Sequence, residues 1–557
     1  MLIYMHNRHA TKWNVLENTT DYTKIIDLLL ENRNINTKKE KEDFLNLTNP
    51  LLYLKQTSPE FKKSLIKTKN LIFEAINNDS TIIIHGDYDA DGICATAILY
   101  NTIQKELGYK KCVYFLPNRF EHGYGLSKKS IDTSLKLTET EQQVLFITVD
   151  CGITSLKEVE YIKQLEHKII ITDHHQKPET LPKADCIVWN DKIVGASIAW
   201  ILGKTLGSKD TQSIGLAALA TVTDVQPLVE MNRAIVKYGL ATLNKKPPVG
   251  IQKLLEIAEK DGTNLTTYDL GWVIGPRINA AGRIENASDA VKLLTDTDIG
   301  QLEQIAEKLN KINMDRQNKT MQMFELASQF DSTEIPKIII SKHKDYHEGI
   351  IGLVASRLVK NHYRPAIVIS LDDTHGKGSV RSIPGINIIK LLRQFEELFV
   401  NLGGHPMAAG FTIELENIEI LENKLLRAIE EVVGEEIFQP VLDIDLEIPL
   451  RLVNMELLEL VNQLQPFGVG NKEPLFVSRD VGIVDFKIVG REKTHLSLKL
   501  FDGNKKHKGI FFGGAKHANN LTMGDSVDVV YSLRKNEFNG FMSVDLMVKD
   551  LVKPETP

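Results

Sequence analysis

Acidic and histidine side chains follow four apolar runs of the chain, in the segments HGDYDADG (85–92), TVDCG (148–152), TDHH (172–175) and TVTDVQP (221–227). Their carboxylates and imidazoles are ligands that divalent first-row metal ions accept. The candidate ligands are His85, Asp89, Asp91, Asp150, His174 and Asp224. This set exceeds what one ion needs, whereas two ions about 3.5–4 Å apart that share a carboxylate would use it. The segments therefore predict a two-metal centre of the kind that hydrolyses phosphate esters.

The residue types also favour one kind of ion. Mixed histidine and carboxylate ligation suits Mn²⁺ better than an all-oxygen Mg²⁺ site. We therefore expect two divalent metal ions as cofactors, with Mn²⁺ preferred and Mg²⁺ as the alternative.

Each of these residues, taken alone, has an ordinary structural alternative. An aspartate that follows a strand commonly caps a helix or forms a turn, which applies to Asp150 and Asp224. The pattern that starts at Asp87 resembles an EF-hand calcium loop, but its twelfth position is Ile98 where that loop needs a glutamate. A His-His pair can be an ordinary packed feature, and Asp173 can serve only to orient a histidine. The joint occurrence of the four segments is what favours a metal centre.

Short runs rich in β-branched residues are expected to form the strands that position these residues. They span 81–84, 112–116, 144–149, 168–172 and 186–189. The segments ICATAILYNTIQKEL and SLKEVEYIKQLE, with apolar residues at helical spacing, follow the first and third runs. This alternation predicts a mostly parallel sheet. Because ligands bind outside the carboxyl ends of the strands in such sheets, three of the four segments are expected at a common rim.

The rest of the chain predicts three further parts. Residues 246–331 are largely helical and polar, and a second α/β unit follows them. After about residue 440, short strand-like runs broken by Gly, Asn and Asp predict a small β-barrel of the OB type. The expected fold class is therefore α/β, with a mostly parallel-sheet lobe, a helical connector, a smaller α/β lobe and a C-terminal OB-like β-barrel.

Composition places the chain among ordinary globular proteins. Its 557 residues are 42% hydrophobic and 25% charged, which excludes a disordered, collagen-like or coiled-coil protein. The formal net charge of −6 provides no overall basic field, so a polyanion must bind to a local patch. The four cysteines form no CxxC pair, and neither a signal peptide nor a membrane-spanning run is present. We therefore expect a soluble, cytoplasmic protein.

The four segments, in this order, resemble the DHH phosphoesterase superfamily, which is named after the triplet found here at 173–175. Later segments narrow the resemblance to the RecJ family of bacterial single-stranded-DNA exonucleases. These segments are PNRFEHGYG (117–125), GPRINAAGR (275–283), HEGIIGLVASRL (347–358), GKGSVRS (376–382), GGHPMAAG (403–410) and QPFGVGNKEPLF (465–476). The chain departs from the usual family text at Thr223, where alanine is common, and at His122, where an acid is common.

The resemblance implies a role for each candidate site residue. All six candidate ligands are implied to bind metal, with Asp150 as the bridge and His175 beside the scissile phosphate. The implied catalytic residues are Asp89, Asp91, Asp150 and His175. The implied nucleic-acid-binding residues are Arg119, Tyr124, Arg277, Asn279, Arg283, Ser379, Arg381 and His405. Arginine presents a rigid fork that fits phosphate oxygens, and a tyrosine can stack on a base. Gly-rich backbone in 376–382 and 403–410 would let N–H groups approach an anion.

The resemblance also implies a division of the chain. The expected parts are an N-terminal segment (1–50), a DHH phosphoesterase domain (51–245), a helical connector (246–331), a DHH-associated domain (332–433) and an OB-fold domain (434–557).

The implied activity is a metal-dependent exonuclease that degrades single-stranded DNA from the 5′ end toward the 3′ end, to mononucleotides, in DNA repair and recombination. The implied partners are single-stranded DNA, a single-stranded-DNA-binding protein and a helicase, with no membrane, and the chain is expected to be a monomer.

Two other functions compete with this one. A DHH phosphodiesterase acting on cyclic dinucleotides or very short oligonucleotides would use the same metals, but such relatives generally end after two lobes, whereas this chain continues past Val433. A binding module with a vestigial metal site belongs to another class. Against it, every ligand position is filled.

Overall fold

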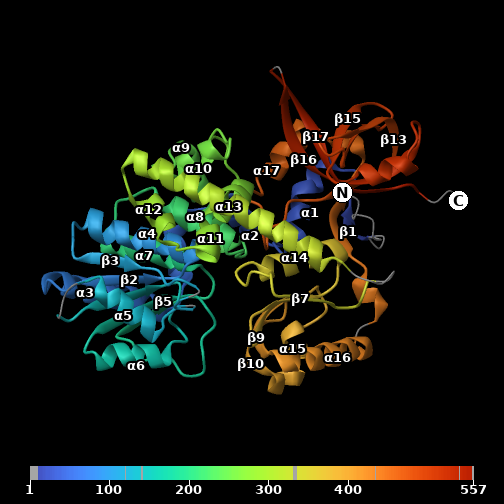
Figure 1. The fold of residues 1–557 in the computed structure, drawn as a ribbon. Helices are drawn as coiled ribbons and strands as arrows, with labels where there is room; N and C mark the ends of the chain where they lie inside the picture. The colour runs from blue at the N-terminus through green and yellow to red at the C-terminus, as the bar shows by residue number, and fades with distance from the viewer. Residues whose placement is uncertain are drawn as a thin grey trace.

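Three β-sheets organise the chain into two α/β lobes and a β-barrel domain (Figure 1). The computed structural model describes residues 11–119, 121–123, 125–138, 142–329, 335–432, 434–538 and 540–554. The predicted α/β class is confirmed. Within these ranges no helix combines the length and apolar character that crossing a bilayer requires.

The first lobe is built on a five-stranded parallel sheet with the order β3-β2-β4-β5-β6. Its strands are β2 (Ile82–Gly86), β3 (Cys112–Phe115), β4 (Leu145–Val149), β5 (Lys168–Asp173) and β6 (Cys186–Trp189). The residues of β2 and β4 are buried throughout, which explains their uninterrupted apolar runs, since helices cover both faces of such sheets. Their carboxyl ends therefore meet at one rim, as the sequence predicts.

Helices form a separate core on each face of this sheet. On one face lie α3 (Pro59–Asn77), α4 (Ala90–Tyr100), α7 (Gly195–Leu206), α8 (Ser213–Thr223) and α9 (Glu230–Lys245). On the other face lie α5 (Lys128–Lys136) and α6 (Leu156–Gln164). Side chains alternate along β2, with Ile82 and Ile84 in the first core and Ile83 in the second.

The predicted connector is in large part packed onto the first lobe. It contains α10 (Val249–Ile257), η4 (Asp269–Ile274), α11 (Gly275–Ile284), α12 (Ser288–Thr295) and α13 (Ile299–Ala327). Leu254, Leu294 and Leu309 belong to the same core as the first sheet. The far end of α13 places Phe324 in the core of the second lobe. The 29-residue α13 therefore joins the two lobes directly (Figure 1).

The second lobe has a mixed sheet with the order β10-β11-β9-β8-β7. Its elements are β7 (Ile339–His343), α14 (Ile351–His362), β8 (Ala366–Leu371), β9 (His375–Arg381), α15 (Ile388–Leu392), β10 (Phe399–His405), β11 (Ala408–Glu414) and α16 (Leu415–Val432). The two Gly-rich segments form strands here instead of loops. A Cβ at Gly378 would lie 2.1 Å from Cζ of Phe411, so this glycine makes room for an aromatic ring in the sheet.

The third sheet closes into a barrel, because β13 pairs with β14 on one side and with β16 on the other. Its strands are β12 (Val441–Glu447), β13 (Phe476–Val489), β14 (His495–Phe501), β15 (Lys506–Phe511), β16 (Ser526–Phe538) and β17 (Phe541–Val552), with α17 (Met455–Asn462) packed beside them.

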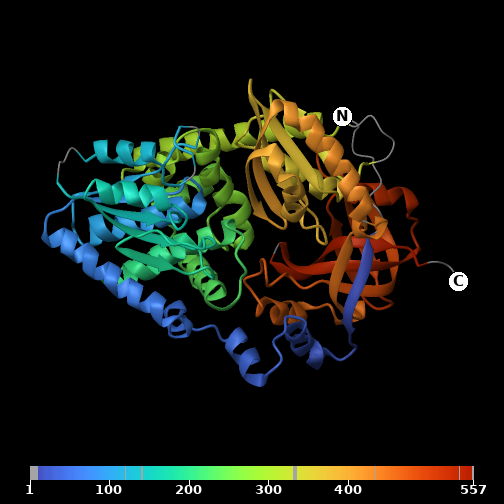
Figure 2. The same ribbon diagram turned by 90° about the horizontal axis from the view of Figure 1, so that it is seen from below.

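The N-terminal segment belongs to this barrel domain. Its strand β1 (Lys12–Asn18) pairs in parallel with β12, as Figure 2 shows at the edge of the C-terminal sheet. Ile25 and Leu29 of α1 (Ile25–Glu31) enter the barrel core. The chain then returns to the first lobe through α2 (Lys38–Leu45) and η2 (Pro50–Gln56).

A buried arginine fastens the barrel domain to the first lobe. Arg233 of α9 has no exposed surface, and its guanidinium lies 3.7 Å from the ring centroid of Phe44. It donates hydrogen bonds to the backbone carbonyls of Phe44, Leu464 and Gln465. Through Nη1 and Nη2, this one side chain ties α9 to the segments that contain Phe44 and Leu464–Gln465.

Candidate metal centre and nucleic-acid cleft

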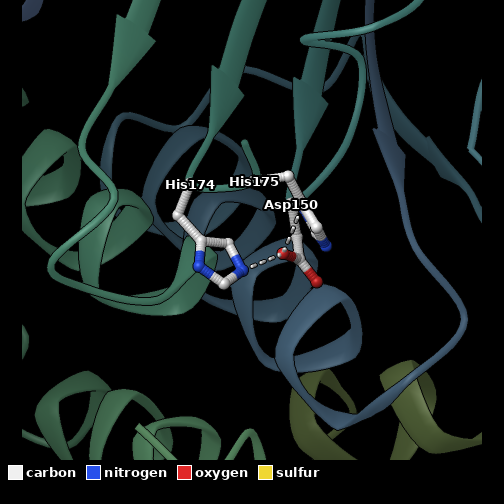
Figure 3. Close-up of side chains that lie close together, drawn as sticks. All are labelled: Asp150, His174 and His175. Carbon is white, nitrogen blue, oxygen red and sulfur yellow. Dashed lines mark ion pairs between the residues drawn. The ribbon is translucent and has the colours of Figure 1, made fainter. Parts of the chain in front are cut away.

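The acidic and histidine residues gather at the carboxyl rim of the first sheet. The loop after β2 carries Asp87 and Asp89, and Asp91 lies in the first turn of α4. β4 ends before Asp150, and β5 leads into His174 and His175. Asp224 follows the end of α8. Figure 3 shows Asp150, His174 and His175 with their polar atoms directed toward one another.

Three overlapping groups of side chains could each hold a metal ion. They are Asp150, His174 and His175; Asp91, His174 and Asp224; and Asp87, Asp89 and Asp150. Within each group the potential ligand atoms lie within 4.8 Å of one another. Asp150 and His174 each belong to two groups, so the groups form one continuous centre.

His174 is the closest link between the groups. Its Nε2 lies 3.0 Å from Oδ1 of Asp150, 3.5 Å from Oδ2 of Asp91 and 4.0 Å from Oδ2 of Asp224. Burial, together with repulsion from His175, lowers the pKa of His174 to about 4. A neutral imidazole is the form that binds a metal ion.

The N-terminus of α7 holds Asp91 in place. Both carboxylate oxygens accept backbone hydrogen bonds of 2.7 Å, from the N–H groups of Gly195 and Ala196. A Cβ at Gly195 would lie 2.6 Å from Cβ of Asp150, so only glycine allows α7 to start this close to the centre.

Local backbone geometry also positions Asp89 and Asp150. Oδ1 of Asp89 caps α4 by accepting hydrogen bonds from the N–H groups of Asp91 and Gly92. Asp150 has a φ of 61°, a left-handed conformation that is unusual for a non-glycine residue. Val225, which follows Asp224, has a φ of 60° and is β-branched. Such strain persists only where the surrounding structure imposes it, and it is concentrated at functional sites.

Asp173 orients His175. Its Oδ1 accepts hydrogen bonds from the backbone N–H groups of His174 and His175 and lies 2.8 Å from Nδ1 of His175. Burial alone would lower the pKa of His175, but this carboxylate raises it to about 9. The His175 side chain is 44% exposed. At neutral pH it is therefore a charged hydrogen-bond donor that is accessible from solvent beside the metal centre.

The centre gathers buried carboxyl groups, and two of their oxygens have no hydrogen-bond partner among the described residues. Asp87, Asp91 and Asp150 are 3%, 2% and 1% exposed. Burial and mutual repulsion raise the pKa of each of these three carboxyls well above its usual range. Oδ1 of Asp87 and Oδ1 of Asp150 are buried and accept no hydrogen bond from the described residues. Orphaned buried carboxylate oxygens of this kind fit divalent cations, which would supply the missing positive charge.

The structure does not bring His85 into any of the three groups. Its Nε2 lies 3.2 Å from Oγ of Ser130, its Nδ1 has no hydrogen-bond partner in the described part of the chain, and burial lowers its pKa to about 3. Asp87, which sequence reasoning left outside the ligand set, belongs to one group instead. The sequence signal for Asp87 is its place directly after β2, two residues before Asp89, at the carboxyl end of a strand where ligands bind.

Arginines line the side of the centre that faces the second lobe. The guanidinium of Arg119 lies 5.5 Å from the ring centroid of Tyr88. Burial and the positive charges of Arg119 and Arg316 lower the pKa of Arg283 to about 10. Nη1 of Arg283 is 3.4 Å from the carbonyl oxygen of Gly349 in the second lobe. These cations therefore collect where the two lobes meet.

Ser379 and Arg381 form a polar pair beside the N-terminus of α14 on the second lobe. Nη1 of Arg381 donates to Oγ of Ser379 at 3.1 Å. A Cβ at Gly352, in the first turn of α14, would lie 3.0 Å from this Oγ and 3.1 Å from Nη2 of Arg381. A helix N-terminus beside a guanidinium and a hydroxyl is suited to bind a phosphate.

The remaining predicted nucleic-acid residues have diverse surroundings. Oδ1 of Asn279 accepts a 2.7 Å hydrogen bond from the N–H of Ala90, so its described contact is with the metal-binding loop. Nε of Arg277 donates to Oδ1 of Asn310 on α13. His405 is exposed at the end of β10. Tyr124 lies outside the described residues.

The parallel sheet, the shared acidic centre at its rim and the facing second lobe define a metal-dependent phosphoesterase of the DHH type. Three family models match the chain: the DHH family N-terminal domain over 81–225, the DHHA1 domain over 336–435 and the RecJ OB domain over 444–550. The chain belongs to the RecJ family of single-stranded-DNA-specific exonucleases.

Curated relatives agree with this assignment. The chain is 30% identical to the single-stranded-DNA-specific exonuclease RecJ of Haemophilus influenzae over 578 residues, which covers 96% of this chain and 97% of the relative. It is 30% identical to the RecJ of Bacillus subtilis over 548 residues, which covers 96% of this chain and 68% of the relative.

Solved structures extend the likeness to the whole fold. RecJ of Thermus thermophilus in complex with Mn²⁺ matches with a TM-score of 0.79 and 27% identity, covering 98% of this chain and 80% of that one. The same protein in complex with Mg²⁺ matches with a TM-score of 0.73 and 26% identity, covering 98% and 79%.

Proposed function

We propose that the protein is a metal-dependent exonuclease that degrades single-stranded DNA from the 5′ end toward the 3′ end, releases mononucleotides and serves DNA repair and recombination. The observation that carries the proposal is the acidic centre joined by Asp150, in a chain that has the three domains of the RecJ family.

Two divalent ions, with Mn²⁺ preferred, are the proposed cofactors. One would be held by Asp87, Asp89 and Asp150, and the other by Asp91, His174 and Asp224, with Asp150 within reach of both. When bound, such ions lower the pKa of the attacking water and neutralise charge that develops on the phosphate. His85 stays a predicted ligand, and its Nδ1, which has no hydrogen-bond partner among the residues that the structure describes, is the atom available for that role.

His175 is proposed to contact the scissile phosphate. Asp173 holds its ring through Nδ1 and keeps it protonated at neutral pH. The imidazolium can then donate a hydrogen bond to a phosphate oxygen, and this bond strengthens as negative charge builds up in the transition state.

The direction of digestion follows from where a terminal phosphate would bind. Arg119 and Arg283 stand between the metal centre and the second lobe, and Ser379 with Arg381 forms a polar pair on that lobe. We assign this pair to the 5′-phosphate, so that the first phosphodiester bond lies at the metal centre. Recognition of phosphates instead of bases makes digestion independent of sequence and sensitive to salt.

A single-strand enzyme needs partners that expose single strands. We propose that the protein acts in the cytoplasm as a monomer, together with a single-stranded-DNA-binding protein and a helicase that unwinds duplex ends.

The proposal is tested by digesting a 3′-labelled, 5′-phosphorylated single-stranded oligonucleotide with Mn²⁺, beside the duplex of the same sequence and a cyclic dinucleotide. We expect a ladder of shortening labelled products from the single strand and none from the duplex. An intact oligonucleotide together with a cleaved dinucleotide would overturn the substrate and favour the small-substrate alternative.

A further inference from the structure

Two exposed aromatic side chains lie at η4, the helical segment that leads directly into α11. Tyr268 is 62% and Trp272 69% exposed, although large aromatic side chains usually bury most of their surface. Their ring centroids are 6.4 Å apart and their planes differ by 25°, so the rings are stacked on each other. Such a pair contributes little to a core and presents a broad apolar face to solvent.

The pair lies beside the end of α8, where Asp224 is located. Tyr268 and Trp272 flank the start of η4 (Asp269–Ile274), one turn apart. A Cβ at Gly271 would lie 3.3 Å from Cγ1 of Val222, and one at Gly275 would lie 2.2 Å from Cγ2 of Thr223. Asp224 is the next residue along the chain.

The helix continues from the aromatic pair to the catalytic rim. η4 is a π-helix that continues directly into α11, so one helical run carries Trp272, Asn279 and Arg283. Asn279 bonds the N–H of Ala90, between two of the acidic ligands, and a Cβ at Gly282 would lie 2.1 Å from the carbonyl oxygen of Tyr88. At about 1.5 Å per residue, Trp272 is roughly 16 Å along the axis from Arg283.

The two ends of this helical run contact different parts of the molecule. Arg283 reaches Gly349 of the second lobe, which carries the Ser379 and Arg381 pair. At the other end, Oγ1 of Thr267 donates a 2.8 Å hydrogen bond to the carbonyl oxygen of Phe467, which lies between α17 and β13 of the barrel domain. A strand that had its 5′ end beside Ser379 and Arg381 and followed this helical run would pass the aromatic pair.

We propose that Tyr268 and Trp272 form a base-stacking platform for the part of the single strand on the 3′ side of the scissile phosphate. This inference rests on the proposed exonuclease function. Exposed aromatic faces bind successive bases without regard to sequence, and they complement the phosphate contacts of the arginines. The platform would hold the strand in line while its 5′ end is shortened.

The test compares a 5′-phosphorylated thymidine 20-mer with a 5′-phosphorylated thymidine dinucleotide, which has only one nucleoside on the 3′ side of its phosphodiester bond. We expect Trp272→Ala to raise KM for the 20-mer about tenfold, the effect of losing one stacked base, and to raise KM for the dinucleotide much less. Trp272→Phe, which keeps an aromatic face, should restore most of the affinity. Phe541→Ala is the matched control, because Phe541 is 81% exposed on the barrel and outside the platform.

Fluorescence provides a second readout that does not require hydrolysis. The 20-mer should quench tryptophan emission of the wild-type protein, and the quenching should be largely lost in Trp272→Phe although that variant still binds. Equal KM values for the 20-mer in wild type and Trp272→Ala, or unchanged quenching in Trp272→Phe, would overturn the platform. Failure of the wild-type protein to cleave either substrate would instead refute the proposed function, and quenching by the 20-mer would still report on the platform.

Discussion

Gly195 and Asp150 are packed so closely that a Cβ on the glycine would lie 2.6 Å from Cβ of the aspartate. The first residues of α7 and the end of β4 therefore meet at the metal centre with no room for another atom. Since the N–H of Gly195 also holds Asp91, this one glycine positions two candidate ligands.

Gly195→Ala should reduce hydrolysis far more than it reduces stability. The added methyl group must move either α7 or Asp150, which weakens Mn²⁺ binding and lowers kcat by at least tenfold. Steady-state kinetics over a range of Mn²⁺ concentrations measure both effects. Gly300→Ala is the control, because a Cβ there would lie 3.4 Å from the nearest atom, on Asp298, which is ordinary contact, and it should leave activity unchanged. Equal kinetics in the two variants would contradict the packing argument.

Asn279 is expected to act on the metal-binding loop. Removing its side chain leaves the N–H of Ala90 without a partner at the start of α4, so Asn279→Ala should weaken Mn²⁺ binding several-fold and lower kcat at subsaturating Mn²⁺. Excess Mn²⁺ should recover part of the loss. A change in KM for DNA with unaltered Mn²⁺ dependence would show that the residue acts on the strand instead.

Arg381→Ala should remove the preference for a phosphorylated 5′ end. The guanidinium and the α14 N-terminus together favour a dianionic group, so the variant should lose most of the difference in KM between 5′-phosphorylated and 5′-hydroxyl oligonucleotides, with a smaller effect on kcat. An unchanged end preference would refute this pair as the 5′-phosphate site.

The ion-free centre predicts a pH-dependent stabilisation by metal. Burial and neighbouring negative charge raise the pKa of Asp224 to about 6, so its contribution to stability is present below pH 4 and is lost as the pH rises through about 6. Metal binding requires the ionised carboxylates. The increase in Tm caused by saturating Mn²⁺ should therefore be larger at pH 7.5 than at pH 5, by differential scanning calorimetry. An increase that is the same at both pH values, or larger at pH 5, would contradict this electrostatic account.

Much of the centre can be predicted from the chain because a parallel sheet brings strand ends together. The acidic residues after β2, β4 and β5 meet for that reason, and hydrophobic periodicity is sufficient to locate these strands. Asp224 follows a helix instead, and its arrival at the same rim depends on how α8 packs.

The structural features that could not be predicted from the sequence depend on long-range packing. Pairing of β1 with β12 joins residues more than 400 positions apart, and no local pattern announces it. The glycines of 376–382 and 403–410 suggest backbone that lets N–H groups approach an anion, but the space at Gly378 is taken by the ring of Phe411. Likewise, His85 lies apart from the three groups because side chains alternate along β2, and this alternation directs its ring toward Ser130.

The most direct test of the two-metal centre is the number of Mn²⁺ ions bound per chain, measured by equilibrium dialysis for the wild type and for Asp150→Asn. The account predicts two ions for the wild type and loss of at least one in the variant, because Asp150 belongs to the group proposed for one ion and its Oδ1 lies 3.0 Å from Nε2 of His174, in the group proposed for the other. One ion in the wild type, or two ions bound with unchanged affinity by Asp150→Asn, would contradict it.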